Sequence, residues 1–246
     1  MPLRDHFRPP LSAIRQWNSF HHAWAVGLAT ALNRVMPPGY VAVPHAVYGI
    51  EIDVACTETD GTPGVPPAWE PPTPTMTIPA SVGTARFGIT VRNFDLPSEL
   101  AAAIELVSPA NKDRPASRDA FVGKCLAYLD CGAGVMIVDV VTSRLANLHD
   151  ELLARLAPCA EPLAASLYAA SYRPTSGEMP SPLGTQVRGV GRLDIWQVEL
   201  VLGEPLPTMP LALLQGPVVP VDLESVYEGV LKDLRVPPRA NGTHTG

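Results

Sequence analysis

The chain has no stretch of apolar residues long enough to cross a bilayer. Its longest apolar run, residues 134–141, is short and is interrupted by Asp139, whereas a membrane-spanning helix needs about 20 apolar residues in succession. The N-terminal residues also lack the apolar run of a secretory signal. We therefore expect a cytoplasmic protein with no membrane partner.

The chain also lacks an excess of basic residues. It has 18 lysines and arginines against 24 aspartates and glutamates, which gives a formal net charge of −6. Nucleic acids and anionic lipids attract basic surfaces. This composition argues against bulk electrostatic attraction to such partners and leaves only a local basic patch open.

Several chemical signatures are missing as well. The four cysteines, at positions 56, 125, 131 and 159, form no Cys-x-x-Cys pair, so neither a zinc knuckle nor a thioredoxin-type motif is indicated. We expect buried, reduced thiols. The sequence has no Gly-x-Ser-x-Gly elbow, no P-loop and no His-Glu-x-x-His motif. The sequence therefore carries none of the commonest hydrolase and nucleotide-binding motifs.

Proline, in contrast, is abundant. The chain has 28 prolines, and many of them fall within residues 62–79. Proline lacks an amide donor and disfavours helix in the residue before it, so this stretch is neither a helix nor a central strand. We expect one α/β domain over residues 1–236, with a proline-rich excursion at about 62–79 and a disordered tail over 237–246. A plain surface loop is the simpler interpretation of the excursion, and a docking segment for a protein partner, with Trp69 as its anchor, is the alternative.

Between these segments, helices alternate with strands. Apolar residues at helical spacing predict helices over residues 19–35, 117–131, 145–156 and 222–234. Alternating or continuous apolar residues predict strands over residues 40–56, 86–94, 101–107, 134–142, 163–172 and 193–202. The alanines of residues 101–107 would also suit a helix. The order predicts an α/β fold with a mixed sheet and flanking helices.

Three segments together resemble an uncharacterised bacterial family, domain of unknown function 4058. The first is Trp-Asn-Ser-Phe-His-His at residues 17–22. The second is Ile-Glu-Leu-Val-Ser-Pro-Ala-Asn-Lys at residues 104–112, followed by Arg-Asp-Ala-Phe at residues 118–121 and by Lys124. The third is Glu-Pro-Leu-Pro-Thr-Met-Pro-Leu at residues 204–211. The match extends over nearly the whole chain. This family has no established activity, so the resemblance implies no function by itself.

A more distant resemblance implies a chemistry. A strand carrying Asp53, a strand carrying Glu105 before Ser-Pro, and a helix carrying Lys124 resemble the restriction-endonuclease-like PD-(D/E)XK fold, in particular its Uma-type members. This resemblance implies that Asp53 and Glu105 bind Mg²⁺ or Mn²⁺ and that all three residues are catalytic. It also implies a restriction-endonuclease-like core with extra C-terminal strands and a final helix.

Two functions follow from this resemblance. The first is a divalent-metal-dependent phosphodiesterase or nuclease, or a degenerate relative of one, with nucleic acid as its partner. Its chemistry needs a hard cation on carboxylate oxygens and a lysine that shares the developing charge. The alternative is a non-catalytic scaffold or protein-interaction module on the same fold.

Each candidate residue also has a simpler structural interpretation. Asp53 fits a turn or capping carboxylate, and Lys124 fits a lysine whose stem lies on apolar surface. Glu105 is harder to explain in this way, because a charge inside an apolar run must be paired or ligated.

Four neighbouring polar residues favour structural roles. Lys112 is expected to be a solvated loop lysine, and Asp139 a hydrogen-bonded structural acid rather than a third ligand. His21 and His22 are adjacent on a predicted helix and diverge by about 100°, so both cannot face one metal. We assign these histidines no role in the site.

Overall fold

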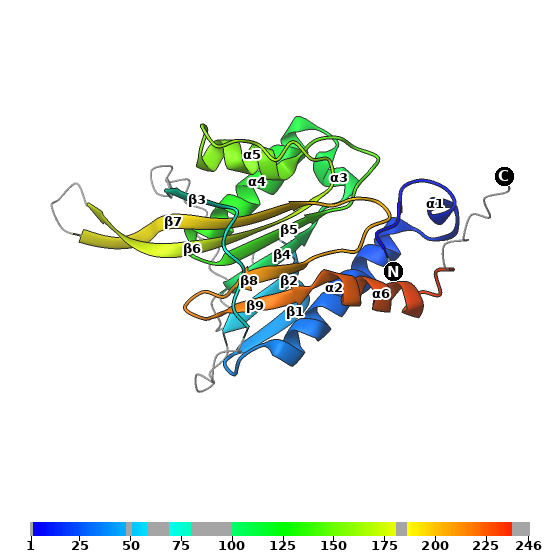
Figure 1. The fold of residues 1–246 in the computed structure, drawn as a ribbon, viewed down its shortest axis with the longest axis horizontal. Coiled ribbons are helices and arrows are strands. Elements are labelled where there is room, and N and C mark those ends of the chain that lie inside the picture. The colour runs from blue at the N-terminus through cyan, green and yellow to red at the C-terminus, as the bar shows by residue number, and fades with distance from the viewer. Residues whose placement is uncertain (1, 48–50, 59–68, 80–99, 181–185, 238–246) are drawn as a thin grey trace.

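The protein is built on one large sheet with helices around it (Figure 1). The computed structural model describes residues 2–47, 51–58, 69–79, 100–180 and 186–237. The predicted strand over residues 86–94 lies outside these ranges. Among the described residues, no helix has both the length and the apolar character needed to cross a membrane.

The sheet has seven strands in the order β1-β2-β4-β5-β6-β7-β3. Strands β4 and β5 are parallel, and the other neighbouring pairs are antiparallel. This arrangement confirms the predicted α/β class with a mixed sheet. In sheet order, the strands are β1 (Tyr40–Val47), β2 (Glu51–Glu58), β4 (Leu100–Leu106), β5 (Gly134–Asp139), β6 (Tyr168–Pro180), β7 (Gln186–Glu199) and β3 (Met76–Pro79).

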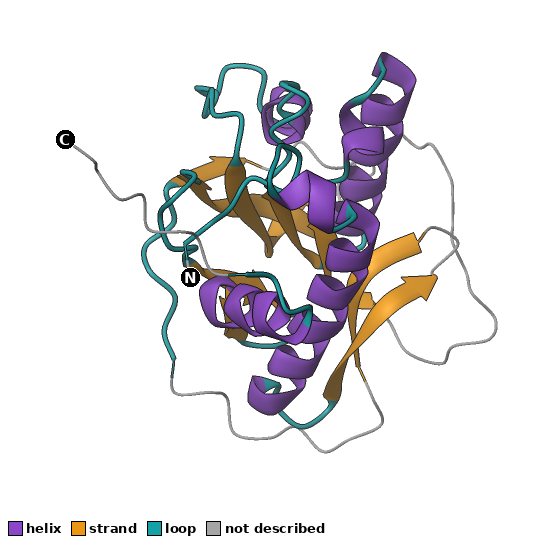
Figure 2. Ribbon diagram, turned by 90° about the vertical axis from the view of Figure 1, so that its right-hand side faces the viewer, coloured by secondary structure: helices purple, strands orange, loops and turns teal. Residues whose placement is uncertain are grey.

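Helices cover the sheet from both sides (Figures 1 and 2). Helices α4 and α5 pack on one face, and α2, α6 and a two-stranded sheet of β8 and β9 pack on the other. The bounds of these elements are α2 (Trp17–Val35), α4 (Pro115–Asp130), α5 (Leu148–Leu156), β8 (Thr208–Ala212), β9 (Val218–Asp222) and α6 (Leu223–Asp233); two short helices are α1 (Leu11–Ile14) and α3 (Pro109–Lys112).

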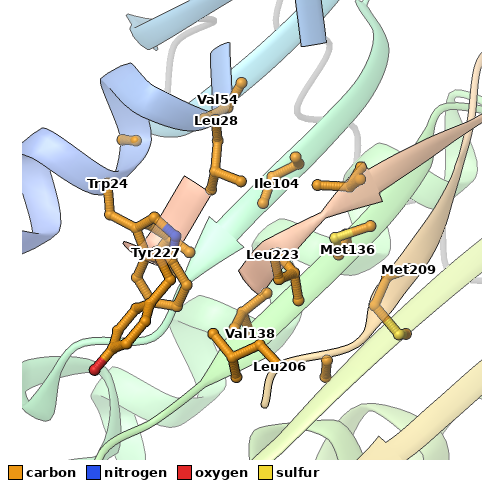
Figure 3. Close-up of a cluster of buried hydrophobic side chains, with 14 of the residues drawn as sticks. Trp24, Leu28, Val54, Ile104, Met136, Val138, Leu206, Met209, Leu223 and Tyr227 are labelled. Carbon is orange, nitrogen blue, oxygen red and sulfur yellow. The ribbon is translucent and has the colours of Figure 1, made fainter. Parts of the chain in front are cut away.

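The core on the α2 side is closed by aromatic packing between helices (Figure 3). Trp24 of α2 and Tyr227 of α6 meet edge to face, with their ring centroids 5.5 Å apart. Both side chains are fully buried. Burying one large apolar side chain contributes about 1.5–3 kcal/mol, so this contact fixes α6 against α2.

Strand β4 is buried on both of its faces, and this determines where Glu105 points. Ile104 and Leu106 belong to the core beneath α2 and α6, whereas Ala103 and Val107 belong to the core beneath α4 and α5. Successive side chains of a strand point to opposite faces. Glu105 is therefore directed toward α4.

Most predicted elements are present with shifted ends. Residues 101–107, whose alanines also suit a helix, form strand β4, because the chain there is covered on both faces. Strand β5 ends at Asp139, three residues before the predicted end, because Asp139 Oδ1 accepts the amide N–H of Val141 at 2.9 Å. The final helix has the predicted cap, since Asp222 Oδ1 accepts the N–H of Ser225 at 2.9 Å.

The end of the proline-rich stretch lies along the edge of the sheet. Pro72 O accepts the indole N–H of Trp196 at 2.7 Å, and the Thr75 hydroxyl donates to the carbonyl of Ile195 at 2.9 Å. Residues 76–79 of the predicted excursion form β3, which pairs with β7. A strand at the edge is where a sheet tolerates proline. Residues 62–68 lie outside the described ranges.

The cysteines are divided between core and surface. Cys56 and Cys125 are buried, as expected, whereas Cys131 and Cys159 are exposed. Burial raises the pKa of the Cys56 thiol to about 12. A buried thiol of this kind is an inert core side chain.

Candidate functional site

Asp53 and Glu105 lie on neighbouring antiparallel strands. The register pairs Val54 of β2 with Ile104 of β4, so the two carboxylates follow one step further along the same pair of strands. Asp53 Oδ2 accepts the amide N–H of Leu106 at 2.8 Å. This bond holds the Asp53 carboxylate beside the residue that directly follows Glu105.

Lys124 extends from α4 to Glu105. Its ammonium lies 2.6 Å from Glu105 Oε2, and it also lies over the Phe121 ring at 5.3 Å from the ring centroid. Burial on its own would lower the pKa of Lys124, but the charge and hydrogen bond of Glu105 outweigh it and raise this pKa above its ordinary value. Lys124 is therefore cationic at neutral pH.

His21 belongs to the same group of side chains. Its Nε2 lies 2.9 Å from the carbonyl oxygen of Leu106 and 3.5 Å from Asp53 Oδ1. Since a carbonyl oxygen only accepts hydrogen bonds, His21 donates from Nε2 to Leu106. The same N–H group, which carries partial positive charge, lies beside the Asp53 carboxylate. The residue pattern predicted no role for His21. The signal that could have found it is its position near the start of α2, next to buried Phe20.

The two adjacent histidines contact different groups. The His22 ring is 6.0 Å from the His21 ring, with an angle of 76° between their planes. His22 donates from Nδ1 to the carbonyl of Asn18 at 2.7 Å. Only His21 contacts Asp53.

A second ion pair lies at the end of the parallel strand β5. Lys112 Nζ is 2.7 Å from Asp139 Oδ2, and both side chains are 0% exposed. The expectation of a solvated loop lysine was wrong, because Lys112 lies in the short helix α3 and its ammonium is buried against the Asp139 carboxylate. The structural role expected for Asp139 is confirmed, since Lys112 and the Val141 N–H hold its oxygens.

A reciprocal cap explains the residues between the two pairs. In the Ser108 to Asn111 turn, the Asn111 side chain accepts from the Ser108 amide at 2.8 Å, and the Ser108 side chain caps the Asn111 amide. This capping box fixes the start of α3 after β4. The segment from Glu105 to Lys112 thus contributes to both ion pairs: Glu105 pairs with Lys124, and Lys112 pairs with Asp139.

Solvent reaches the first pair and not the second. The side chains of His21 and Asp53 are each 14% exposed and that of Lys124 is 13% exposed, whereas Glu105 is 2% exposed. The group lies at the carboxyl end of β4, beside its parallel neighbour β5. The carboxyl ends of parallel strands are where open α/β sheets bind ligands.

The donor set at this position fits a hard divalent cation. Among the described residues, no group of three or more histidine, cysteine or acidic side chains is arranged to hold a metal. Mg²⁺ does not require such a group, because one or two carboxylates commonly bind it together with waters and phosphate oxygens. Asp53 and Glu105 supply two carboxylates on adjacent strands.

Comparison of the chain with protein-family models, with curated proteins and with solved structures gave no match. The two family resemblances therefore remain predictions from the motif residues, and any function must be argued from the site itself.

Proposed function

We propose that His21, Asp53, Glu105 and Lys124 form a divalent-metal-dependent phosphodiesterase site that acts on nucleic acid. One observation carries this proposal: a carboxylate that is 98% withdrawn from solvent is held by a lysine at 2.6 Å, with a second carboxylate on the adjacent strand. A buried carboxylate is costly unless it is paired or ligated. Here the lysine pairs with the buried carboxylate, and the second carboxylate beside them completes a donor set of the kind that binds a divalent cation.

The order of the three residues supports the resemblance that suggested them. Asp53 is on one strand, Glu105 is on the next strand of the sheet, and Lys124 is on the following long helix. The usual lysine two positions after the glutamate is absent, since Leu106 and Val107 follow Glu105. Lys124 supplies an ammonium to the same carboxylate from the helix.

Each residue has a role in the proposed reaction. Asp53 and Glu105 would hold the cation, which when bound lowers the pKa of a coordinated water and offsets charge on the phosphate. Lys124 would bind a phosphate oxygen and share the charge that develops in the transition state. His21 would orient Asp53, as the partners of metal-binding carboxylates commonly do.

A non-catalytic scaffold is the second candidate, and a specific observation favours it. Lys124 and Glu105 neutralise each other, while Asp53 accepts the Leu106 N–H and His21 donates to the Leu106 carbonyl. These contacts close the end of β4 as a polar cap would. On this proposal the protein binds another protein and cleaves nothing.

One experiment separates the two candidates. The purified protein is incubated with single- and double-stranded DNA and RNA, with Mg²⁺, with Mn²⁺ and with a chelator. Phosphodiesterase activity requires metal-dependent cleavage that Asp53→Asn and Glu105→Gln each abolish. Lys124→Ala should slow cleavage by about 10²–10³, the usual effect of removing one preorganised transition-state contact.

Matched variants control for folding and for contamination. Glu199→Gln alters an exposed carboxylate on β7, and Lys232→Ala alters a lysine of α6 whose side chain is 67% exposed; both should cleave at the wild-type rate. Cleavage that survives both site carboxylate substitutions comes from a contaminant. If wild-type protein cleaves none of the substrates, the phosphodiesterase proposal fails and the scaffold remains.

A further inference from the structure

A second pair of histidines lies away from the end of β4. His22 of α2 and His45 of β1 have ring centroids 4.7 Å apart, with an angle of 40° between the ring planes. They are 23 residues apart in the chain. Two elements of the fold thus bring two imidazoles together.

His22 is held in the tautomer that a metal ligand needs. Its Nδ1 donates to the carbonyl of Asn18 at 2.7 Å, so the lone pair of the neutral ring is on Nε2. Metal-binding histidines commonly donate from their other nitrogen to a backbone carbonyl, because this fixes the ring and increases its basicity. His22 already has this arrangement.

His45 has unused ring nitrogens. Both of its ring nitrogens are withdrawn from solvent, and neither has a hydrogen-bond partner among the described residues. A buried polar atom without a partner carries a desolvation cost. A bound ion would offset this cost at one nitrogen.

The backbone of His45 is also unusual for its position in a strand. Its φ is 50°, and the register pairs Pro44 with Val54 and Ala46 with Ile52 without a partner for His45. A residue with a side chain rarely adopts this left-handed conformation, which is strained and occurs often at functional sites. The conformation turns His45 out of the regular pleat, where its ring meets His22.

Both histidines line a groove between α2 and α6. The groove has a volume of about 720 Å³, and Thr30, Arg34, Ser225 and Asp233 contribute polar groups to it. A pocket of this size takes a small ligand. An ion at the two imidazoles would therefore keep coordination positions open to water or to an oxygen of such a ligand.

We propose that His22 and His45 bind a borderline transition-metal ion, Zn²⁺ in particular, at this groove. A metal held at about 2.1 Å by one nitrogen of each ring, with an angle of about 90–110° at the metal, separates the ring centroids by roughly 4.6–5.3 Å. The observed 4.7 Å lies within this range. Imidazole nitrogens suit Zn²⁺, Ni²⁺ and Cu²⁺ and suit Mg²⁺ poorly. This site is thus separate in position and in metal from the carboxylates at the end of β4.

The test is Zn²⁺ binding by isothermal titration calorimetry above pH 7, because metal affinity depends on pH and a histidine ligand must be deprotonated. We expect one Zn²⁺ per chain, undisturbed by millimolar Mg²⁺. His22→Gln and His45→Gln should each weaken binding by at least about 10-fold, because loss of a supporting contact alone costs 10–100-fold. Glu105→Gln and Cys159→Ser should bind Zn²⁺ as the wild type does.

Long-range proton–nitrogen spectra of the wild type give a readout that needs no variant. Zn²⁺ should shift Nε2 of His22 and one ring nitrogen of His45, and leave Nε2 of His21 unchanged. The proposal is overturned if these nitrogens do not shift, if either histidine variant binds as tightly as the wild type, or if Glu105→Gln or Cys159→Ser abolishes binding. None of these outcomes depends on whether the protein cleaves nucleic acid.

Discussion

Removing one partner of the buried Lys112–Asp139 pair should destabilise the protein strongly. Both side chains are 0% exposed, and their nitrogen and oxygen are 2.7 Å apart. Lys112→Met leaves the Asp139 carboxylate buried without its cation. Breaking a buried pair in this way typically costs about 3–5 kcal/mol. For a chain of this size, that corresponds to a fall of roughly 6–20 °C in Tm.

The pH dependence of this variant follows from the same contact. Burial already raises the pKa of Asp139 to about 6, although Lys112 opposes the shift. Without Lys112 the folded-state pKa lies higher still, so the folded protein takes up the proton before the unfolded chain does. The destabilisation by Lys112→Met should therefore be largest at pH 8 and should shrink as the pH falls.

Thermal and urea unfolding followed by circular dichroism measure both effects. The matched control is the exposed pair Arg144–Asp113, whose side chains are 49% and 55% exposed; Asp113→Asn should change the unfolding free energy by less than about 1 kcal/mol. The double variant Lys112→Met with Asp139→Leu should recover part of the loss, since an apolar pair can replace a buried ion pair, while the Val141 N–H loses its acceptor. A single variant as stable as Asp113→Asn would refute the argument.

Two further predictions concern pH and backbone packing. Burial lowers the pKa of His6 from 6.5 to about 4, so the unfolded chain takes up this proton first as pH falls. The wild type should therefore lose up to about 3 kcal/mol of unfolding free energy between pH 6.5 and 4, and the His6→Gln variant should not show this loss. Urea unfolding of both proteins at each pH measures it, and equal pH profiles would contradict the prediction. A Cβ at Gly134 would lie 2.0 Å from Ala212 O, whereas one at Gly123 would meet nothing within 4 Å. Gly134→Ala should thus lower Tm by several degrees, and Gly123→Ala should raise the unfolding free energy by about 0.5–1 kcal/mol; the same sign for both would exclude the packing argument.

The sequence predicted the central strands well because their patterns have one dominant cause. Residues 134–142 are almost continuously apolar, and the structure buries every residue of β5 between two layers. Helix α6 was predicted from its periodicity and from Asp222, and both its extent and its cap agree. Burial and capping are local consequences of residue type, so single elements can be read from the chain.

The hairpin of β8 and β9 shows where local signals fail. Pro210 and Pro220 argue against strands in the sequence, yet the two prolines are register partners. In a two-stranded sheet each strand needs ladder donors on one side only, so a facing pair of prolines costs little. The register of the hairpin decides this, and the residue pattern of either strand alone does not contain it.

The candidate site was only partly predictable for a similar reason. Asp53, Glu105 and Lys124 were predicted from a resemblance to the PD-(D/E)XK fold, and the structure brings Lys124 to Glu105 and Asp53 to the same strand end. His21 was missed because its contact with the Leu106 carbonyl joins positions 85 residues apart. Lys112 was misassigned because a short turn after a strand is usually exposed.

Under the proposed function, the two ion pairs at the ends of β4 and β5 have different roles, because they differ in access to solvent. Each joins an acid near a strand end to a lysine on a helix, at 2.6 Å for Glu105–Lys124 and 2.7 Å for Lys112–Asp139. A site must admit its substrate, and only the first pair has an exposed member, with Asp53 beside it. Substitution of Lys124 should therefore change activity more than stability, and substitution of Lys112 should change stability more than activity. Measuring both quantities on both variants tests this assignment, and the reverse pattern would place the chemistry at Asp139 instead.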